Sequence, residues 1–225
     1  MPKRANGPVA SGATHGPDVE LELLEKAAPD GLRQGFALED VHITGVSLVE
    51  AEAGSGRFAR VRMDEVDLSG SRLRAIELLD AILCGISASN GDWGGARMRR
   101  VLIDGARLTG LSLAEARIEE VHLRGCKLDY ANFRHSEIER VTFEDCVLSG
   151  ADFQGAQIGQ TRFAGCQLAQ ADFSKAKLSA VDFRGSQLAL AGSLTGMGGA
   201  IIDGAQLIEL ARPLAGELGI VVEEG

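Results

Sequence analysis

The sequence predicts an all-β solenoid, a four-sided parallel β-helix closed at its C-terminal end by a short helical cap. Three observations support this prediction. Between residues 151 and 188 a large apolar residue recurs every five positions, the residue two before it is small, and the residue between these two is polar. Phe153, for example, follows Ala151 and Asp152. Such a unit is typical of a three-residue strand with two inward side chains, followed by a two-residue bend.

The spacing of five excludes the two simpler elements. On an α-helix, five residues turn the chain by about 500°, so successive apolar side chains would scatter around the helix axis. On one continuous strand, an odd spacing puts successive apolar residues on opposite faces. A chain that bends after each repeat keeps all of them on one side. Glycine recurs at the last bend position, where bends tolerate it best, as at Gly150, Gly155, Gly165 and Gly185.

The repeat extends over most of the chain. Counting in fives from Leu38 to Leu188 gives 31 central positions, of which 29 are large and apolar. The other two are Ala53 and Ala88. An internal repeat of this length predicts a solenoid whose coils stack on their neighbours.

The number of walls follows from the column pattern. A period of four repeats aligns Phe133 with Phe153 and Phe173, whereas a period of three repeats would stack Phe133 on Leu148. The longer period makes the interior columns uniform. Each coil is therefore expected to have four walls.

The repeat Ala-Asp-Phe-Gln-Gly at residues 151–155 resembles the pentapeptide repeat family, whose pattern is small, Asp or Asn, Leu or Phe, polar, turn. Asn132, Asp152, Asp172 and Asp182 occupy its Asp/Asn position. The resemblance covers residues 36–190. It implies a right-handed quadrilateral β-helix of pentapeptide repeats.

The ends of the chain depart from the repeat. Residues 1–17 are rich in Gly, Pro, Ala and Ser and are expected to be a disordered N-terminal tail. Residues 18–35 are expected to cap the first coil. The alternation of Val19, Leu21 and Leu23 suits a strand, whereas Leu23, Leu24 and Ala27 suit a short helix, so both forms stay open.

Residues 191–225 are expected to form a C-terminal cap of one helix and a short strand. Asp203 and Gln206 fit a capping box at the start of the helix. Pro213 is expected to kink or divide the helix, Gly219 to end it, and residues 220–222 to form the strand. The apolar stripe of the helix consists of Leu207, Leu210, Leu214 and Leu218.

This stripe has two interpretations. It covers the open end of the core, since an uncovered end would expose Phe and Leu. Alternatively it is a homodimer contact, which C-terminal segments provide in some proteins that the chain resembles. One element could serve both purposes.

The sequence predicts no catalytic, cofactor or metal site. Cys126, Cys146 and Cys166 share one column, but they occupy the small inward position that Ala, Val or Ser fills elsewhere, where Cys packs as a small hydrophobe. Cys84 falls at a bend and is expected to be more reactive. Trp93 is expected to be buried, with small neighbours such as Ala88 making room for its indole; an exposed aromatic contact is the alternative. The histidines form no catalytic set.

Composition narrows the class of protein. The chain has 225 residues and a formal net charge of -9, which argues against direct nucleic-acid binding. No run of about eighteen apolar residues is present, so no membrane span is expected. Because the first twenty residues also lack the apolar segment of a secretory signal, a cytoplasmic location with reduced cysteines is expected.

The charge pattern separates two functions. Some members of the family that the chain resembles mimic duplex DNA with an acidic rod and modulate DNA gyrase. Residues 36–190, however, carry 22 acidic and 18 basic residues. The wall of Phe58 carries Arg57, Arg60, Arg97, Arg99 and Arg100 ahead of Glu119, Glu120, Glu137 and Glu139. We therefore expect a non-enzymatic interaction scaffold for an unknown protein partner. A DNA-mimicking modulator of gyrase is the alternative.

Overall fold

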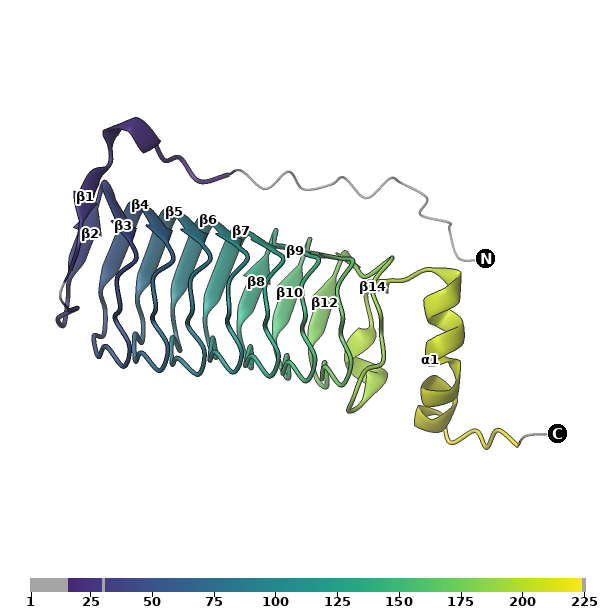
Figure 1. The fold of residues 1–225 in the computed structure, drawn as a ribbon. Coiled ribbons are helices and arrows are strands. Elements are labelled where there is room, and N and C mark those ends of the chain that lie inside the picture. Colours follow the sequence, from purple (N-terminus) through teal and green to yellow (C-terminus); the bar gives the residue numbers. More distant parts are fainter. Residues whose placement is uncertain (1–15, 30, 224–225) are drawn as a thin grey trace.

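The computed structural model describes residues 16–29 and 31–223 and shows one straight rod of stacked coils (Figure 1). The predicted disordered tail falls almost entirely outside the described residues. All strand pairs are parallel, and from β4 to β12 each residue pairs with its equivalent four repeats further on, as Phe58 pairs with Leu78 and Ile158 with Leu178. The predicted four-walled parallel β-helix is therefore confirmed.

Two adjacent walls carry the regular strands. We call the wall centred on Phe58 and Leu78 the first wall and the wall centred on Met63 and Leu83 the second wall. Four eight-residue strands run along both walls and through the corner between them: β4 (Arg57–Asp64), β5 (Glu77–Cys84), β6 (Arg97–Asp104) and β7 (Arg117–Arg124).

Shorter strands extend both walls. On the first wall lie β2 (Ala37–Glu39), β8 (Glu137–Glu139), β10 (Gln157–Gly159) and β12 (Lys177–Ser179). On the second wall lie β1 (Glu25–Ala27), β3 (Val41–Thr44), β9 (Thr142–Glu144), β11 (Arg162–Ala164), β13 (Val181–Asp182) and β14 (Ala200–Ile201). The third and fourth walls are held by single bridges such as Ser47 to Asp67 and Asp152 to Asp172.

The interior is filled by the repeated apolar residues. Phe153 stacks between Phe133 and Phe173 with ring centroids 4.7 and 4.6 Å away. The phenylalanines of the second wall form a parallel stack, and the two stacks meet edge to face at 6.0 Å between Phe153 and Phe163, a favoured arrangement. Trp93 is 2% exposed, and its Nε1–H donates to Ser71 Oγ at 3.0 Å. The expected burial of Trp93 is thus confirmed.

The bends repeat one backbone conformation. From 35 to 185, every residue whose number is a multiple of five has a positive φ, whether it is glycine or not; Ala75, Arg100 and Gly105 are examples. The Asp or Asn before an apolar centre supports the following bend. Asp152 Oδ1, for instance, accepts the backbone N–H of Gln154 at 2.9 Å, an Asx turn. The family pattern at that position therefore has a local physical cause.

At the N-terminal end, a 3₁₀ turn, η1 (Leu21–Leu23), precedes β1, which pairs with β3 so that Glu25 lies opposite Val41. The spacing between paired residues is shorter here than in the regular coils. Both interpretations of residues 18–35 misplaced their element: the 3₁₀ turn occupies the residues expected to form a strand, and the strand ends at Ala27, where the helix was expected. Pairing with the edge of β3 decides the strand.

At the C-terminal end, one further coil follows the last regular repeat. Ala191 pairs with Asp172, and Ala200 of β14 pairs with Val181 of β13, so the register is one position shorter than in the regular coils. A 3₁₀ turn, η2 (Leu194–Met197), and the helix α1 (Gly204–Glu217) complete the end. No helix among the described residues is long and apolar enough to cross a bilayer.

The cap differs from expectation in two details. The expected strand at residues 220–222 is wrong, because the backbone there is irregular and the short strand of this region is β14, before the helix. Pro213 does not divide α1, which is continuous through it. The capping box at Asp203 and Gln206 is present as expected. Gly219, with φ +71°, follows the helix, and the N–H of Ile220 donates to Ala215 O in a Schellman motif.

Candidate interaction surface

The first wall presents charged side chains of both signs. Along its corner with the second wall, residues on successive coils alternate between acid and base, and neighbouring strands are joined by ion pairs. Arg60 binds Asp40 at 2.6 Å, and Arg140 binds Glu120 at 3.4 Å. The wall is therefore a mixed surface rather than a continuous acidic stripe.

The Asp80–Arg100 pair is the most buried member of this corner ladder. Arg100 donates to both carboxylate oxygens of Asp80, at 2.6 and 2.5 Å, and the Asp80 side chain is only 8% exposed. The backbone N–H of Asp18 also donates to Asp80, at 3.0 Å. Burial raises the pKa of Asp80, but the hydrogen bonds from Arg100 and Asp18 outweigh it and hold the pKa below its usual value.

A shallow groove of about 550 Å³ lies on the same wall over β7, β8, β10 and β12. Gly159 forms part of its floor, and a Cβ there would collide with the carboxylate of Glu139. Glu119, Glu137 and Lys177 also line it. The groove is therefore lined by charged side chains of both signs around a glycine, and such a polar, shallow surface suits contact with another protein.

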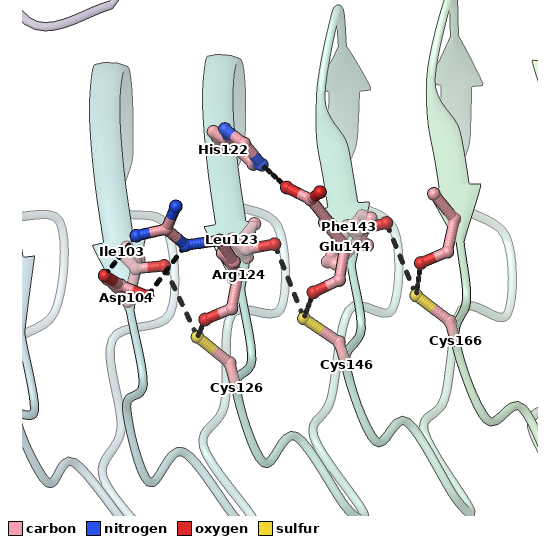
Figure 2. A network of polar contacts seen from close by, with 11 residues as sticks. Ile103, Asp104, His122, Leu123, Arg124, Cys126, Phe143, Glu144, Cys146 and Cys166 are labelled. Atoms are coloured by element: carbon pink, nitrogen blue, oxygen red, sulfur yellow. Dashed lines mark hydrogen bonds and ion pairs between the residues drawn. The ribbon is translucent and has the colours of Figure 1, made fainter.

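On the second wall, two histidines meet carboxylates of the next coil. His42 Nε2 lies 2.6 Å from Asp64 Oδ2. His122 Nε2 lies 2.8 Å from Glu144 Oε2, the pair that Figure 2 shows. Both histidines face outward as the repeat predicts. Their carboxylate partners were not predicted from the sequence. Each partner lies two residues after the position that is equivalent to the histidine in the next coil, and it also faces outward. The pairs lie four coils apart and form no shared site.

The three aligned cysteines are buried, as their inward position predicts. Each thiol donates to backbone carbonyls; Cys146, for example, reaches Leu123 O at 3.5 Å and Glu144 O at 3.3 Å (Figure 2). Hydrogen bonding with Cys126 and Cys166, together with burial, raises the pKa of Cys146 far above its usual range. All three thiols are buried and held by backbone carbonyls, and a buried structural cysteine is unreactive, so the stack serves packing.

Cys84 differs from the three stacked cysteines in its exposure. It ends strand β5 and is half-buried, whereas the other three are buried, and burial raises the pKa of its thiol. Burial disfavours the reactive thiolate, whereas access to solvent favours reaction, so the greater reactivity of Cys84 stays a prediction.

The four leucines of the C-terminal stripe separate into two pairs. Leu210 is 4% exposed and Leu214 is half-buried, and both line an apolar hollow of about 230 Å³ with Leu194 and Met197 of η2. Leu207 and Leu218 are 52% and 78% exposed. One side of α1 thus covers the last coil, and another side leaves apolar surface open.

Gly196–Gly199 (Gly-Met-Gly-Gly) has a packing role. A Cβ on Gly196 would collide with the carbonyl oxygen of Phe173, and a Cβ on Gly199 with that of Leu178. Gly199 also has a φ of +97°. These glycines let the backbone of this segment approach the last coil closely.

Repeated four-walled coils with a filled interior and a charged exterior define a solenoid built from five-residue units. Residues 116–191 match the family model for the pentapeptide repeat region. The expected resemblance to pentapeptide repeat proteins is thus confirmed over these residues, and the same repeat geometry extends well beyond them toward the N-terminus.

Solved structures with the same fold include a trypsin-treated form of QnrB1, described as a plasmid-mediated fluoroquinolone resistance protein. It is 19% identical, with a TM-score of 0.57, and the match covers 89% of this chain and 97% of QnrB1. Full-length QnrB1 is 18% identical, with a TM-score of 0.56 over 84% and 94% of the two chains.

HetL from the cyanobacterium Nostoc, a pentapeptide repeat protein involved in heterocyst differentiation regulation, is 23% identical. Its TM-score is 0.44, and the match covers 75% of this chain and 90% of HetL. No curated protein matches the sequence.

Proposed function

We propose that this protein is a non-enzymatic interaction scaffold that binds a protein partner in the cytoplasm through the outside of its rod. The observation that carries the proposal is the first wall, a regular parallel sheet that carries outward charges of both signs, most of them joined between coils by ion pairs. Such a surface is pre-organised, so a partner that docks on it has little ordering entropy to overcome. Mixed charge also favours specificity for one partner.

The alternative, a DNA-mimicking modulator of gyrase, has less support. QnrB1 shares the fold, and its description as a fluoroquinolone resistance protein is compatible with such a role. A duplex mimic, however, needs negative charge at regular intervals along the whole rod. Arg97, Arg99 and Arg117 interrupt the first wall, and they would repel a basic groove.

The C-terminal helix supports a second part of the proposal. Leu210 and Leu214 cap the rod, while Leu207, Ile208 and Leu218 stay exposed. We propose that this exposed side of α1 joins two copies into a homodimer. Analytical ultracentrifugation at rising concentration tests it: a monomer that persists throughout contradicts the dimer and leaves the cap intact.

Affinity capture from the native host, followed by reconstitution with the purified candidate, tests the scaffold function. We expect a stoichiometric complex of the two purified proteins that forms without turnover of any small molecule. If no captured protein reconstitutes, the scaffold function is contradicted.

A supercoiling assay with purified gyrase tests the alternative. We expect no inhibition and no protection from a fluoroquinolone at micromolar protein. Either effect would replace the scaffold by the mimic.

A further inference from the structure

We propose that Arg97 and Arg99 of β6 form a docking surface for an acidic segment of the partner protein, in which two carboxylates bind the two guanidinium groups. We call these two residues the β6 arginine pair. The proposal rests on the scaffold function proposed above and assigns it a surface and a partner chemistry.

The β6 arginine pair differs from the other arginines of the first wall in having no acidic partner among the described residues. Arg57, Arg60, Arg100, Arg117 and Arg140 each form at least one ion pair with a described residue. Arg97 and Arg99 are exposed, and within the described part of the chain neither forms an ion pair or a side-chain hydrogen bond. Their charges are therefore available to another molecule.

The acids beside the pair are already engaged. Glu77, in register with Arg97, binds Arg57 at 3.3 Å instead. Glu119, in register with Arg99, lies 4.0 Å from Arg140. Neither of these two ladder carboxylates is thus left over to neutralise the β6 arginine pair.

Arg97 also stands directly beside Arg117 in the parallel ladder. Like charges at adjacent ladder positions destabilise a sheet. The rod therefore holds uncompensated positive charge at a cost to its own stability, on a chain whose net charge is -9. A ligand carboxylate would remove that cost.

The geometry selects the ligand. Arg97 and Arg99 flank the inward Met98, so both lie on the outer face of one strand. Their Cα atoms are about 6.7 Å apart, two strand residues. An extended segment with acidic residues at alternate positions has the same spacing, and a guanidinium binds a carboxylate through two parallel hydrogen bonds. Leu79, half-buried and in register with Arg99, adds an apolar contact beside the pair.

A nucleic acid fits this surface less well. Glu77 and Glu119 lie one strand step of about 4.8 Å to either side of the pair. A duplex carries charges about 1.7 Å apart along its axis and would have to pass over both glutamates. Two carboxylates on a short segment bind the arginines without reaching that far.

The proposal is tested by NMR titration of the full-length chain with a short peptide that carries Glu-Thr-Glu between glycine and serine residues. Its matched control carries Gln-Thr-Gln. We expect the Glu peptide to shift the Nε–H signals of Arg97 and Arg99, the Gln peptide to leave them in place, and added salt to weaken binding. The double variant Arg97→Gln/Arg99→Gln should lower the peptide affinity by roughly tenfold or more.

Arg107→Gln is the matched variant, because Arg107 is also exposed and outside any described ion pair but lies on the third wall. It should leave peptide affinity within about twofold. Equal affinity of the double variant and the unchanged chain overturns the proposal. So does a DNA duplex that shifts the same two signals at lower concentration than the Glu peptide, since the surface would then be a polyanion site.

Loss of fold does not obscure the result, because removal of two like charges should leave the melting temperature unchanged or slightly raised. The scaffold function is tested separately with the reconstituted partner of the preceding section. If that partner binds the double variant as well as the unchanged chain, the scaffold remains and the β6 arginine pair is excluded as its docking surface.

Discussion

At the scale of single residues, the bends set the main conformational demand on this sequence. Among the residues that the structure describes, nineteen other than glycine have a positive φ, and all of them occupy the last position of a repeat. For an L-residue this left-handed conformation costs roughly 1–2 kcal/mol. The stacked hydrogen bonds of each bend, such as Ala75 N–H to Gly94 O at 2.9 Å, hold the backbone there. A residue that adopts this conformation without cost should therefore stabilise the rod at these positions.

Ala75→Gly should stabilise the protein. Ala75 is exposed and has a φ of +54°, so glycine relieves the left-handed conformation without removing a buried contact. The entropic cost of glycine, about 0.5–1 kcal/mol, offsets part of the gain, and a net gain of up to about 1 kcal/mol is expected in urea unfolding. Ala169→Gly is the control, because Ala169 is exposed in a bend without a positive φ and should lose stability. Equal effects of the two changes would contradict the explanation.

Residue identity predicted which side chains point inward but not how the irregular ones are accommodated. The five-residue phase placed Trp93 inside correctly. Its partner Ser71 could not be predicted, because serine and alanine both fit the small inward position of the repeat. Only the structure shows that the Ser71 hydroxyl accepts the hydrogen bond of the indole N–H. Gly56 is similar: a Cβ there would collide with the ring of Phe36. Both depend on the shape of one neighbouring side chain rather than on the repeat.

At the scale of elements, the two ends of the rod were harder to predict than its coils. The helix α1 followed from its capping box and apolar spacing. Gln206, however, is buried and donates to the carbonyls of Phe183 and Ser186 at 2.6 and 2.7 Å, which spacing alone does not indicate. The apolar, β-branched run at 220–222 suits a strand, but a strand needs a partner edge, and residues 220–222 pair with no described strand. The edge offered by β13 is taken by Ala200–Ile201.

The helix α1 should tolerate changes on one side and not on the other. Leu210→Ala removes a buried contact over the last coil and should cost about 2–4 kcal/mol in the free energy of unfolding. Leu207→Ala changes a half-exposed side chain and should cost less than about 1 kcal/mol. Denaturant unfolding of both variants below the concentration of any self-association measures the difference. Similar losses would contradict the orientation of α1.

At the scale of the whole molecule, carboxylates with lowered pKa values are spread along the outside of the rod. Hydrogen bonds from arginines lower the pKa of Asp104 and Asp182, and hydrogen bonds from Ser69 lower that of Asp67. Asp104 binds Arg124 of the next coil, whereas Asp182 and Asp67 bind Arg184 and Ser69 of their own coil. Protonation of these groups should therefore weaken both a contact between coils and bends within coils.

Acid should therefore unfold the rod over a defined pH range. Each of these carboxyl groups has a folded pKa below its unfolded value of about 3.9, so the unfolded chain binds more protons in acid. The stabilisation is present above the unfolded pKa and is lost as the pH falls through the folded pKa values. Stability should change little between pH 7 and pH 5 and should fall steeply below about pH 4.

Asp80→Asn tests whether the buried carboxylate of the corner ladder sets this acid limit. At neutral pH the variant should lose about 3 kcal/mol, the low end for a broken buried ion pair, since Arg100 is a quarter exposed and regains solvent. Its further loss in acid should be smaller than that of the unchanged chain, because one lowered pKa has been removed. Asp40→Asn, in the same corner ladder but exposed, should change either quantity less. Urea midpoints measured from pH 7 to pH 2 report both quantities, and parallel pH profiles for Asp80→Asn and the unchanged chain would show that this buried carboxylate does not set the acid limit.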